Sequence, residues 1–361
     1  MIKPILIIII LYYLFYKYKN TNIEKFSNNK SYKRCKEIKG IYSDVLQDYN
    51  INITNNNDWN LYIPCGYNKV ENELKLLNIN NKEQIIFGIN GCDKIVSKPK
   101  LWNSIKNKYG IKKASKLMPC SYILNNDDDM KYFIKKYKQN KLYIMKGKEQ
   151  RKKGIKITRN LEEILNGKYN KFLLVQEYLD NIFLINKRKL NLRCYVVILC
   201  HNNNIEIYIH KNGKCIFTNQ DYNINSDEFE KHITSFNLDT SIYNINPFNF
   251  YDLEKHFNKY NINYKFIMNK IYNNLRLVSL SFKNNICNLK KLNKNKSYQL
   301  FGIDYILDNN LNPYLLEFNK GPNMKYNIDK DYKLKYEIIE DVYSLMGIID
   351  KQNNNFVKID L

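Results

Sequence analysis

The chain has 361 residues, of which 44% are hydrophobic and 14% aromatic. This composition excludes a disordered chain and allows one large domain, or two to three small ones, with a buried core. Its 58 lysines and arginines against 35 acids leave a net charge of +23, which favours nucleic acid, an anionic membrane surface or an acidic protein tail as partner. General over-use of lysine in a sequence rich in Lys, Asn, Ile and Tyr is an alternative source of this charge.

The eight cysteines follow no C-x-x-C spacing and no regular framework, and the four histidines are equally scattered. A structural zinc site is therefore not expected. We expect a reduced, cytosolic main domain without a disulfide framework, because structural disulfides are rare in reducing compartments.

The first element is a nearly unbroken apolar run, PILIIIILYYLFYKYKN, over Pro4–Asn20. Its length is borderline for a membrane span, so a signal-peptide core and a buried helix are alternatives. No small-residue cleavage site follows, tyrosines and lysines suited to the membrane interface close the run, and most of the nearby positive charge lies after it. We therefore expect a membrane anchor over residues 1–20, with the rest of the chain on the cytoplasmic side.

Residues 21–57 are rich in Asn, Lys and Ser, which predicts a stalk or linker with one short helix over Tyr42–Asp48. The ordered part is expected to begin near residue 58. Apolar residues alternate there as in a strand over Trp59–Ile63, and a helical pattern follows over Val70–Leu77.

A strand over Leu142–Met145 ends in Lys146, and a basic loop containing glycines leads to a second strand at Ile155–Ile157. A lysine at a strand end beneath a mobile loop can hold a phosphate and shield it from water, and Gly154 would belong to that loop. The alternative is a solvated hairpin tip. The chain contains neither G-x-x-x-x-G-K-[ST] nor G-x-G-x-x-G, so neither a P-loop nor a Rossmann site is indicated.

The next strand, Phe172–Val175, is apolar and passes into the more polar segment Gln176, Glu177, Tyr178 and Leu179. Such a strand end can bind an adenine edge through its backbone while apolar side chains pack on the ring. An interior strand leaving the core would have the same pattern.

Polar residues then alternate with apolar ones along Arg188–Leu199, which places Lys189, Asn191 and Arg193 on one face of a strand. Two cations two residues apart on one face repel each other unless an anion, usually phosphate, lies between them. A charged edge strand is the alternative.

Two strands, Phe301–Leu307 and Tyr314–Lys320, flank a segment dense in turn formers. A hairpin centred between residues 310 and 311 places Asp304 opposite Glu317 and Asn319 opposite a glycine. These three polar side chains then share one face, and Tyr305, Leu316 and Phe318 take the other.

Like charges directly across a strand pair are unfavourable, so the pairing of Asp304 with Glu317 calls for a neutralising group. Magnesium is held by one or two carboxylates together with substrate phosphates, which fits two acids and the amide oxygen of Asn319. A solvent-exposed face, where the charges cost little, is the alternative.

Read in order, these segments resemble the tubulin–tyrosine ligase-like family of ATP-grasp ligases. The resemblance covers nearly everything after residue 58. It is carried by KLMPCSYIL (Lys116–Leu124), YIMKGKEQRKKGIKI, the Gln-Glu-Tyr and Arg-Lys-x-x-x-Arg block in LVQEYLDNIFLINKRKLNLRCYV, KHITS (Lys231–Ser235), and the hairpin order Phe-Gly-apolar-Asp followed by Glu-x-Asn-x-x-Pro. The hairpin and the Gln-Glu-Tyr block are specific in combination.

The resemblance implies an α+β fold of ATP-grasp type, with two lobes that hold ATP and Mg²⁺ between them and a small N-terminal α/β domain. Here it would be preceded by the N-terminal transmembrane helix. It implies that Lys189 and Arg193 are catalytic and that Asp304, Glu317 and Asn319 hold the metal. It also implies an ATP site formed by Lys146, Gly154, Gln176, Glu177, Tyr178, Leu179, Lys189, Asn191 and Arg193, and Lys98 is a further candidate cation.

The chain departs from the family pattern at several positions. Asn191 stands where the family usually has aspartate, Gly147 where proline is usual and Ser235 where asparagine is typical. A later family arginine has no counterpart; Ile216 takes its place and Lys214 is the nearest cation. These changes leave open the amino acid and acceptor, and they motivate an alternative, a catalytically inactive membrane-tethered binder of anionic protein or lipid.

By this reading the chain is an ATP-dependent carboxylate–amine ligase. It would add an amino acid, with glutamate favoured and glycine or tyrosine possible, to an acidic protein tail such as that of tubulin. No nucleic-acid partner is expected, because no aromatic–basic RNA motif appears. The predicted boundaries are 1–20 (anchor), 21–57 (stalk or linker), 58–125 (N-terminal domain), 126–185 (central lobe), 186–350 (C-terminal lobe) and 351–361 (tail).

Overall fold

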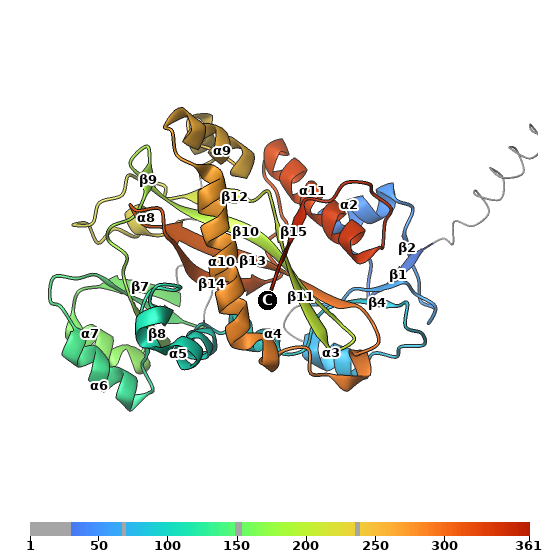
Figure 1. Cartoon of the computed structure of the whole chain (residues 1–361), viewed down its shortest axis with the longest axis horizontal. Coiled ribbons are helices and arrows are strands. Elements are labelled where there is room, and N and C mark those ends of the chain that lie inside the picture. The colour runs from blue at the N-terminus through green and yellow to red at the C-terminus, as the bar shows by residue number, and fades with distance from the viewer. Residues whose placement is uncertain (1–29, 67–69, 149–153, 235–238) are drawn as a thin grey trace, which may run out of the picture.

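The computed structural model describes residues 30–66, 70–148, 154–234 and 239–361, and Figure 1 shows their arrangement. The expected membrane anchor over residues 1–20 lies outside these ranges, as does Ser235. Within the described ranges, no helix combines the length and apolar character needed to cross a bilayer.

The described residues form a mixed α/β fold with two sheets (Figure 1). The large sheet has 11 strands in these ranges, with the path β15-β11-β10-β13-β4-β3-β1-β2 and with β12, β14 and β9 paired beside it. Its strands are β1 (Ser31–Lys33), β2 (Asn52–Ile53), β3 (Leu61–Tyr62), β4 (Ile85–Phe87), β9 (Leu184–Ile185), β10 (Arg188–His201), β11 (Asn204–His210), β12 (Lys214–Phe217), β13 (Ser297–Leu307), β14 (Pro313–Lys320) and β15 (Phe356–Ile359).

The small sheet has four strands in the order β5-β8-β6-β7. They are β5 (Ser121–Ile123), β6 (Tyr143–Gly147), β7 (Ile155–Thr158) and β8 (Phe172–Glu177), and their helices are α6 (Asp127–Lys136) and α7 (Leu161–Leu165). A separate apolar cluster that includes Phe133, Tyr143 and Val175 forms the core beneath this sheet. The arrangement of two sheets, each with its own core, is consistent with an ATP-grasp-like fold.

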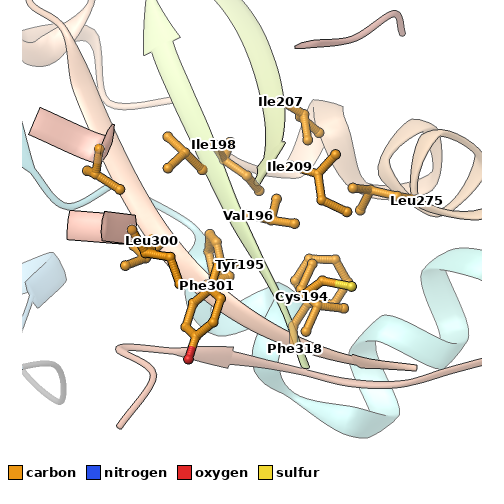
Figure 2. Close-up of a cluster of buried hydrophobic side chains, with 14 of the residues drawn as sticks. Cys194, Tyr195, Val196, Ile198, Ile207, Ile209, Leu275, Leu300, Phe301 and Phe318 are labelled. Carbon is orange, nitrogen blue, oxygen red and sulfur yellow. The ribbon is translucent and has the colours of Figure 1, made fainter. Parts of the chain in front are cut away.

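The other helices lie around the large sheet. They are α2 (Ile41–Asp48), α3 (Val70–Leu76), α4 (Cys92–Val96), α5 (Lys98–Ala114), α8 (Phe229–His232), α9 (Phe250–Lys259), α10 (Tyr264–Phe282) and α11 (Asp329–Met346). In Figure 1 the long helix α10 crosses in front of the sheet. Figure 2 shows part of the core, in which Leu275 of α10 lies near Ile207 and Ile209 of β11.

Helix α10 covers the apolar face of the β13–β14 hairpin. Tyr305 donates a hydrogen bond to Asn274 Oδ1 at 3.3 Å, and the Phe282 and Phe318 rings meet edge to face at 5.8 Å. Because side chains alternate along a strand, the residues between these apolar positions point to the opposite face. That opposite face carries the polar side chains described below.

The prediction of a stalk or linker over residues 21–57 is wrong for residues 30–57, the part that the structure describes. Strand β1 pairs with β2 and β3 inside the large sheet, and the helix predicted at Tyr42–Asp48 is present as α2. Helix α2 buries Val45 and Leu46, and Tyr336 of α11 donates a hydrogen bond to Asp48 at 2.6 Å. The strands have two or three residues each, too few to show a periodic pattern in the sequence.

Residues 351–361 do not form a free tail. Strand β15 pairs with β11, with Ile359 beside Ile207. Lys351 forms ion pairs with Glu340 at 2.6 Å and Asp341 at 2.5 Å on α11. The last residues are therefore part of the large sheet.

The expectation of no disulfide is also wrong. The structure pairs Cys35 with Cys65 and Cys200 with Cys287. Cys35 and Cys65 follow β1 and β3, which are parallel neighbours, so pairing of the strands brings both cysteines to the same edge. The sequence separations of 30 and 87 residues gave no spacing from which these pairs could be recognised.

Candidate functional site

Four charged residues form a row across adjacent strands on the polar face of the large sheet. Lys214 of β12 is opposite Arg193 of β10, Arg193 is opposite Asp304 of β13, and Asp304 is opposite Glu317 of β14. The cross-strand pairing places the four side chains on one face. The expected register of the hairpin is confirmed, including Asn319 opposite Gly302.

The hairpin departs from the expected pattern beyond this row. Its register shifts by one residue between Asp304 and Tyr305, so Leu315, and not Leu316, lies opposite Tyr305. Leu315 is fully buried, whereas Leu316 is half-buried. The assignment of Leu316 to the apolar face is therefore corrected: a β-bulge changes which residue of β14 enters the core.

Arg193 and Asp304 form a bidentate ion pair. The Arg193 Nη2 atom donates to Asp304 Oδ2 at 2.9 Å, and Nε donates to Oδ1. Burial opposes the charge of Arg193, but the Asp304 carboxylate outweighs it and raises the pKa of Arg193. Burial also raises the pKa of Asp304 against the opposing effect of Arg193. The pair fixes the arginine in place at the centre of the row.

Glycine at position 302 leaves room for this arginine. A Cβ at Gly302 would lie 3.1 Å from Arg193 Cδ and 3.0 Å from Pro322 Cβ. Any larger residue would therefore displace the guanidinium or the loop after β14.

Glu317 is surrounded by positive and donor groups. Lys98, at the start of α5, approaches its carboxylate at 3.7 Å, and Asn319 Nδ2 donates to Oε1 at 2.9 Å. Burial by itself would raise the pKa of Glu317. The pKa is nevertheless lowered, because burial is outweighed by the charge of Lys98, the hydrogen bond from Asn319 and the charges of Lys146 and Arg193. The structure thus brings Lys98 and all three expected metal-ligating residues to one place.

Lys146 reaches the same place from β6 of the small sheet. Its side chain is buried, and Nζ donates to the neutral Gln176 Oε1 at 2.7 Å. Burial lowers the pKa of Lys146 to about 8, and the nearby Glu317 and Asp304 carboxylates oppose this shift. The two sheets therefore face each other across the candidate site.

Lys189 is the second buried lysine. Its Nζ donates to the Tyr178 hydroxyl at 3.0 Å, and it lies 4.6 Å from the centre of the Tyr178 ring. Burial, reinforced by the charge of Lys146, lowers the pKa of Lys189 to about 7. Within the described residues, neither lysine has a carboxylate at ion-pair distance. Two buried cations with only neutral partners leave positive charge to be compensated.

Asn191 lies between Lys189 and Arg193 on β10. Its Nδ2 donates to Thr234 Oγ1 at 3.0 Å, while its buried Oδ1 has no hydrogen-bond partner in the described part of the chain. An unpaired buried acceptor is rare in folded proteins and often marks a ligand or water position. Ile216, which takes the place of a family arginine, is directly opposite Asn191.

In the segment expected to bind adenine, residues 176–179, most side chains form hydrogen bonds within the protein. Gln176 donates to Ser121 Oγ at 2.8 Å in addition to accepting from Lys146. Glu177 accepts from Tyr122 and Lys141, each at 2.8 Å. The groups of this segment that remain available to a ligand are backbone atoms and the half-buried side chain of Leu179, whose N–H makes no hydrogen bond with described residues.

Gly154 is buried at the start of β7, beside Ile155, which pairs with Lys146. It therefore adjoins the phosphate candidate Lys146. The lid expected around it falls largely on residues 149–153, outside the described ranges.

A second charged group, not anticipated as a site, extends the row beyond its Lys214 end. Lys214 pairs with Asp331 of α11 at 2.8 Å, and Asp331 also pairs with Lys335 at 2.8 Å. Both α11 residues are buried. The group carries one net positive charge beside Arg193. The helical spacing of Asp331 and Lys335 is visible in the sequence, but its relation to β12 is not.

The residues present fit a magnesium–triphosphate group. Lys98, Lys146, Lys189 and Arg193 supply four positive charges against two from Asp304 and Glu317, so the site has excess positive charge before any ligand is added. Two carboxylates and an amide oxygen form the oxygen donor set that Mg²⁺ prefers. Buried lysines and an arginine suit phosphate oxygens.

Comparison with known proteins agrees with this geometry. A model of the Tubulin-tyrosine ligase family matches residues 77–355. The chain is 25% identical over 286 residues to the probable tubulin polyglutamylase ttll-9 of Caenorhabditis elegans, covering 74% of this chain and 68% of that protein. It is 26% identical to the mouse (Mus musculus) tubulin monoglutamylase TTLL4, covering 72% of this chain but only 23% of the relative.

A relative with a different named activity matches as well. The chain is 28% identical over 206 residues to tubulin glycylase 3D of Tetrahymena thermophila, covering 53% of this chain and 19% of that protein. The chain therefore spans about two thirds of the nematode protein and a quarter or less of the mouse and ciliate ones. With most of its length matched by the family model, this chain belongs to the tubulin-tyrosine ligase family, a family of amide-forming ligases.

Proposed function

We propose that this protein uses ATP to join an amino acid to a carboxylate on an acidic protein tail, such as the tail of tubulin. One observation carries the proposal. Two buried lysines from different sheets, Lys146 and Lys189, have only neutral partners among the described residues. Lys146 is close enough to the Asp304–Glu317 carboxylate pair to interact with it, and Lys189 is close enough to interact with Lys146. This arrangement supports binding of a polyphosphate together with a divalent cation.

The chemistry explains why ATP is needed. A carboxylate does not accept an amine at neutral pH, because an oxide ion is too poor a leaving group. Transfer of the γ-phosphoryl group to a carboxylate oxygen yields ADP and an acylphosphate. The amine of the incoming amino acid then attacks the acyl carbon, phosphate leaves, and the amine nitrogen loses a proton to give the amide. Catalysis of both steps depends mainly on positioning and charge neutralisation.

In this proposal Asp304, Glu317 and Asn319 would hold magnesium, which would supply positive charge against the phosphates of ATP. Lys146 and Lys189 hold the phosphate oxygens in a site shielded from water. Arg193, fixed by Asp304, faces the reacting acyl group and stabilises negative charge on its oxygen during attack by the amine.

Several features favour glutamate as the added amino acid, with glycine and tyrosine as alternatives. The relatives include proteins named as glutamylases, although one is named as a glycylase. The Lys214–Asp331–Lys335 group adds positive charge beside Arg193, which suits an anionic amino acid. The net charge of +23 likewise suits an acidic acceptor tail.

Attachment to a membrane through residues 1–20 is part of the proposal, with the catalytic part on the cytoplasmic side. The apolar run and the positive charge that follows it support this placement. The two disulfides, in contrast, are typical of oxidising compartments. Protease digestion of the full chain in sealed membranes separates these placements: digestion from the cytoplasmic side alone supports the proposal, and protection there contradicts it.

The activity is tested by incubating the full chain with Mg-ATP, a glutamate-rich peptide and each of the twenty amino acids in turn, followed by mass spectrometry of the peptide. We expect a mass increase equal to one or more added residues, largest with glutamate. A folded protein that binds Mg-ATP but never changes the peptide mass would favour the alternative of an inactive binder, which Asn191 and Ile216 motivate.

A further inference from the structure

We propose that His232 is a positioning residue for nucleotide binding: it fixes the hydroxyl of Tyr178 as a hydrogen-bond acceptor and thereby holds the ammonium group of Lys189 over the nucleotide site. This inference rests on the proposed function, because it assigns a role within the same site. His232 closes the short helix α8, which is far in sequence from both partners. The segment KHITS, which contains His232, is part of the family resemblance, but the resemblance assigned no role to the histidine.

A chain of hydrogen bonds connects the three side chains. The Tyr178 hydroxyl lies 3.0 Å from His232 Nδ1 and 3.0 Å from Lys189 Nζ. On the far side of the ring, His232 Nε2 lies 2.6 Å from the backbone oxygen of Ser226. His232 and Tyr178 are both buried. The chain therefore runs from a fixed backbone carbonyl to the candidate phosphate-binding lysine.

The direction of each hydrogen bond follows from the groups at the two ends. The Ser226 carbonyl can only accept, so Nε2 of His232 carries the proton. Burial lowers the pKa of His232, which favours the neutral ring, and Nδ1 is then an acceptor. Tyr178 consequently donates to His232, and its oxygen lone pairs face Lys189. An ammonium group can only donate, so each hydrogen bond from Lys189 to the Ser226 carbonyl has one donor and one acceptor.

The surroundings hold the imidazole ring in this orientation. The rings of Tyr178 and Tyr222 meet it edge to face at 5.4 and 5.6 Å. Tyr222 donates to the backbone oxygen of Asp180 at 3.3 Å. Its hydroxyl also lies near that of Tyr178, so the Tyr222 oxygen is a second acceptor for the Tyr178 proton beside His232 Nδ1. With its ring packed and both nitrogens bonded, His232 has little freedom to turn.

The segment that carries His232 connects the two sheets. Asp227 pairs with Arg159, at the end of β7, at 2.5 Å, and Thr234 accepts from Asn191 of β10 at 3.0 Å. The same short segment thus contacts both Lys189, through Tyr178, and Asn191. Loss of the His232 acceptor would leave the direction of the Tyr178 hydroxyl unfixed, so the Lys189 ammonium would lose an acceptor of fixed orientation.

The test measures Mg-ATP binding by isothermal titration calorimetry with the full chain. We expect His232→Leu and Tyr178→Phe each to weaken binding about tenfold, and His232→Asn, which retains a side-chain acceptor, to weaken it by less than about threefold. In a Lys189→Ala background, His232→Leu should cause no further loss, because the group that it positions is gone. Thermal unfolding of each variant reports folding separately, and His256→Leu on α9 is the control histidine.

The outcomes separate this inference from the proposed function. Failure of the wild-type chain to bind Mg-ATP would remove the proposed nucleotide site itself. Normal wild-type binding with unchanged affinity in both His232→Leu and Tyr178→Phe would overturn the role of His232 alone. If the losses of Mg-ATP affinity caused by Lys189→Ala and by His232→Leu are additive in the double variant, the role of His232 would also be overturned. Additive losses would show that His232 acts independently of Lys189. If His232→Leu fails to fold, Tyr178→Phe with and without Lys189→Ala decides the question.

Discussion

At the scale of single residues, the site is defined by charges that would be unfavourable if left alone. Asp304 and Glu317 stand directly opposite each other, yet each has a cation beside it, Arg193 and Lys98 respectively. Lys146 and Lys189 are buried without such a partner in the described residues. Because burying an uncompensated charge is costly, these lysines are better explained by a ligand than by stability of the fold.

Replacing Glu317 with glutamine should lower amino-acid incorporation by at least about a hundredfold while leaving the protein folded, because in the proposed site the side chain would ligate the metal and it does not pack in the core. Incorporation into the acidic peptide is measured by mass spectrometry, and folding by circular dichroism. Glu337→Gln on α11, outside the site, is the matched control. Undiminished turnover in Glu317→Gln would remove the metal assignment.

Mg-ATP affinity should fall as pH rises, because phosphate binds the protonated lysines. Burial lowers the pKa of Lys189 to about 7 and of Lys146 to about 8, so both ammonium groups are progressively lost as pH rises through these values. Because bound phosphate raises the pKa values of both lysines, Mg-ATP binding takes up protons at pH values above about 7. For each proton taken up, the affinity falls by at most about tenfold per pH unit.

Calorimetry in two buffers of different ionisation enthalpy measures this proton uptake. Lys189→Arg, which stays charged, should show less uptake near pH 7 to 8 than the wild type. An affinity that does not change between about pH 6.5 and pH 9 would show that these lysines are not the phosphate ligands.

At the scale of elements, the strands that form the site were predicted mainly from the alternation of polar and apolar residues. Strand β10 and the β13–β14 hairpin were predicted because a period of two over seven or more residues, bounded by turn formers, has few other structural explanations. The bulge after Asp304 was not predicted, since no glycine marks it. Strands β1 and β2 were missed because they are too short to show a period, and the Lys214–Asp331 contact because it joins distant segments.

Gly302 links the hairpin to the arginine, and its replacement is a test at this scale. Gly302→Ala should lower the rate of incorporation by about tenfold with little change in thermal stability, because the new Cβ would lie 3.1 Å from Arg193 Cδ and shift the guanidinium, which in the proposed site faces the reacting acyl group. Gly66→Ala, where a Cβ would meet no atom within 4 Å, is the control. Equal activity of Gly302→Ala and wild type would show that the position of Arg193 is not critical.

At the scale of the whole molecule, the site lies where the two sheets face each other, so neither sheet is expected to bind nucleotide alone. Lys146 comes from the small sheet, Arg193 and Asp304 from the large one, and Lys98 from α5. The resemblance to a ligase family could be recognised from the sequence because most of these residues stand in characteristic local motifs. Their convergence, and the integration of residues 30–57 and 351–361 into the large sheet, required the structure.

Deleting residues 1–20 should release a soluble chain that retains wild-type activity on the acidic peptide, because the proposed anchor is not part of the catalytic fold. The full chain should co-sediment with lipid vesicles, and the shortened chain should not. Flotation assays and mass spectrometry measure the two properties. Aggregation of the shortened chain would indicate instead that the apolar run belongs to the core.

The most direct test of the account is a crystal structure of the protein with Mg²⁺ and a non-hydrolysable ATP analogue. We expect the triphosphate to lie within hydrogen-bond distance of Lys146, Lys189 and Arg193, with the metal on oxygens of Asp304, Glu317 and Asn319. A nucleotide bound elsewhere, or bound here with its metal away from these three residues, would contradict it.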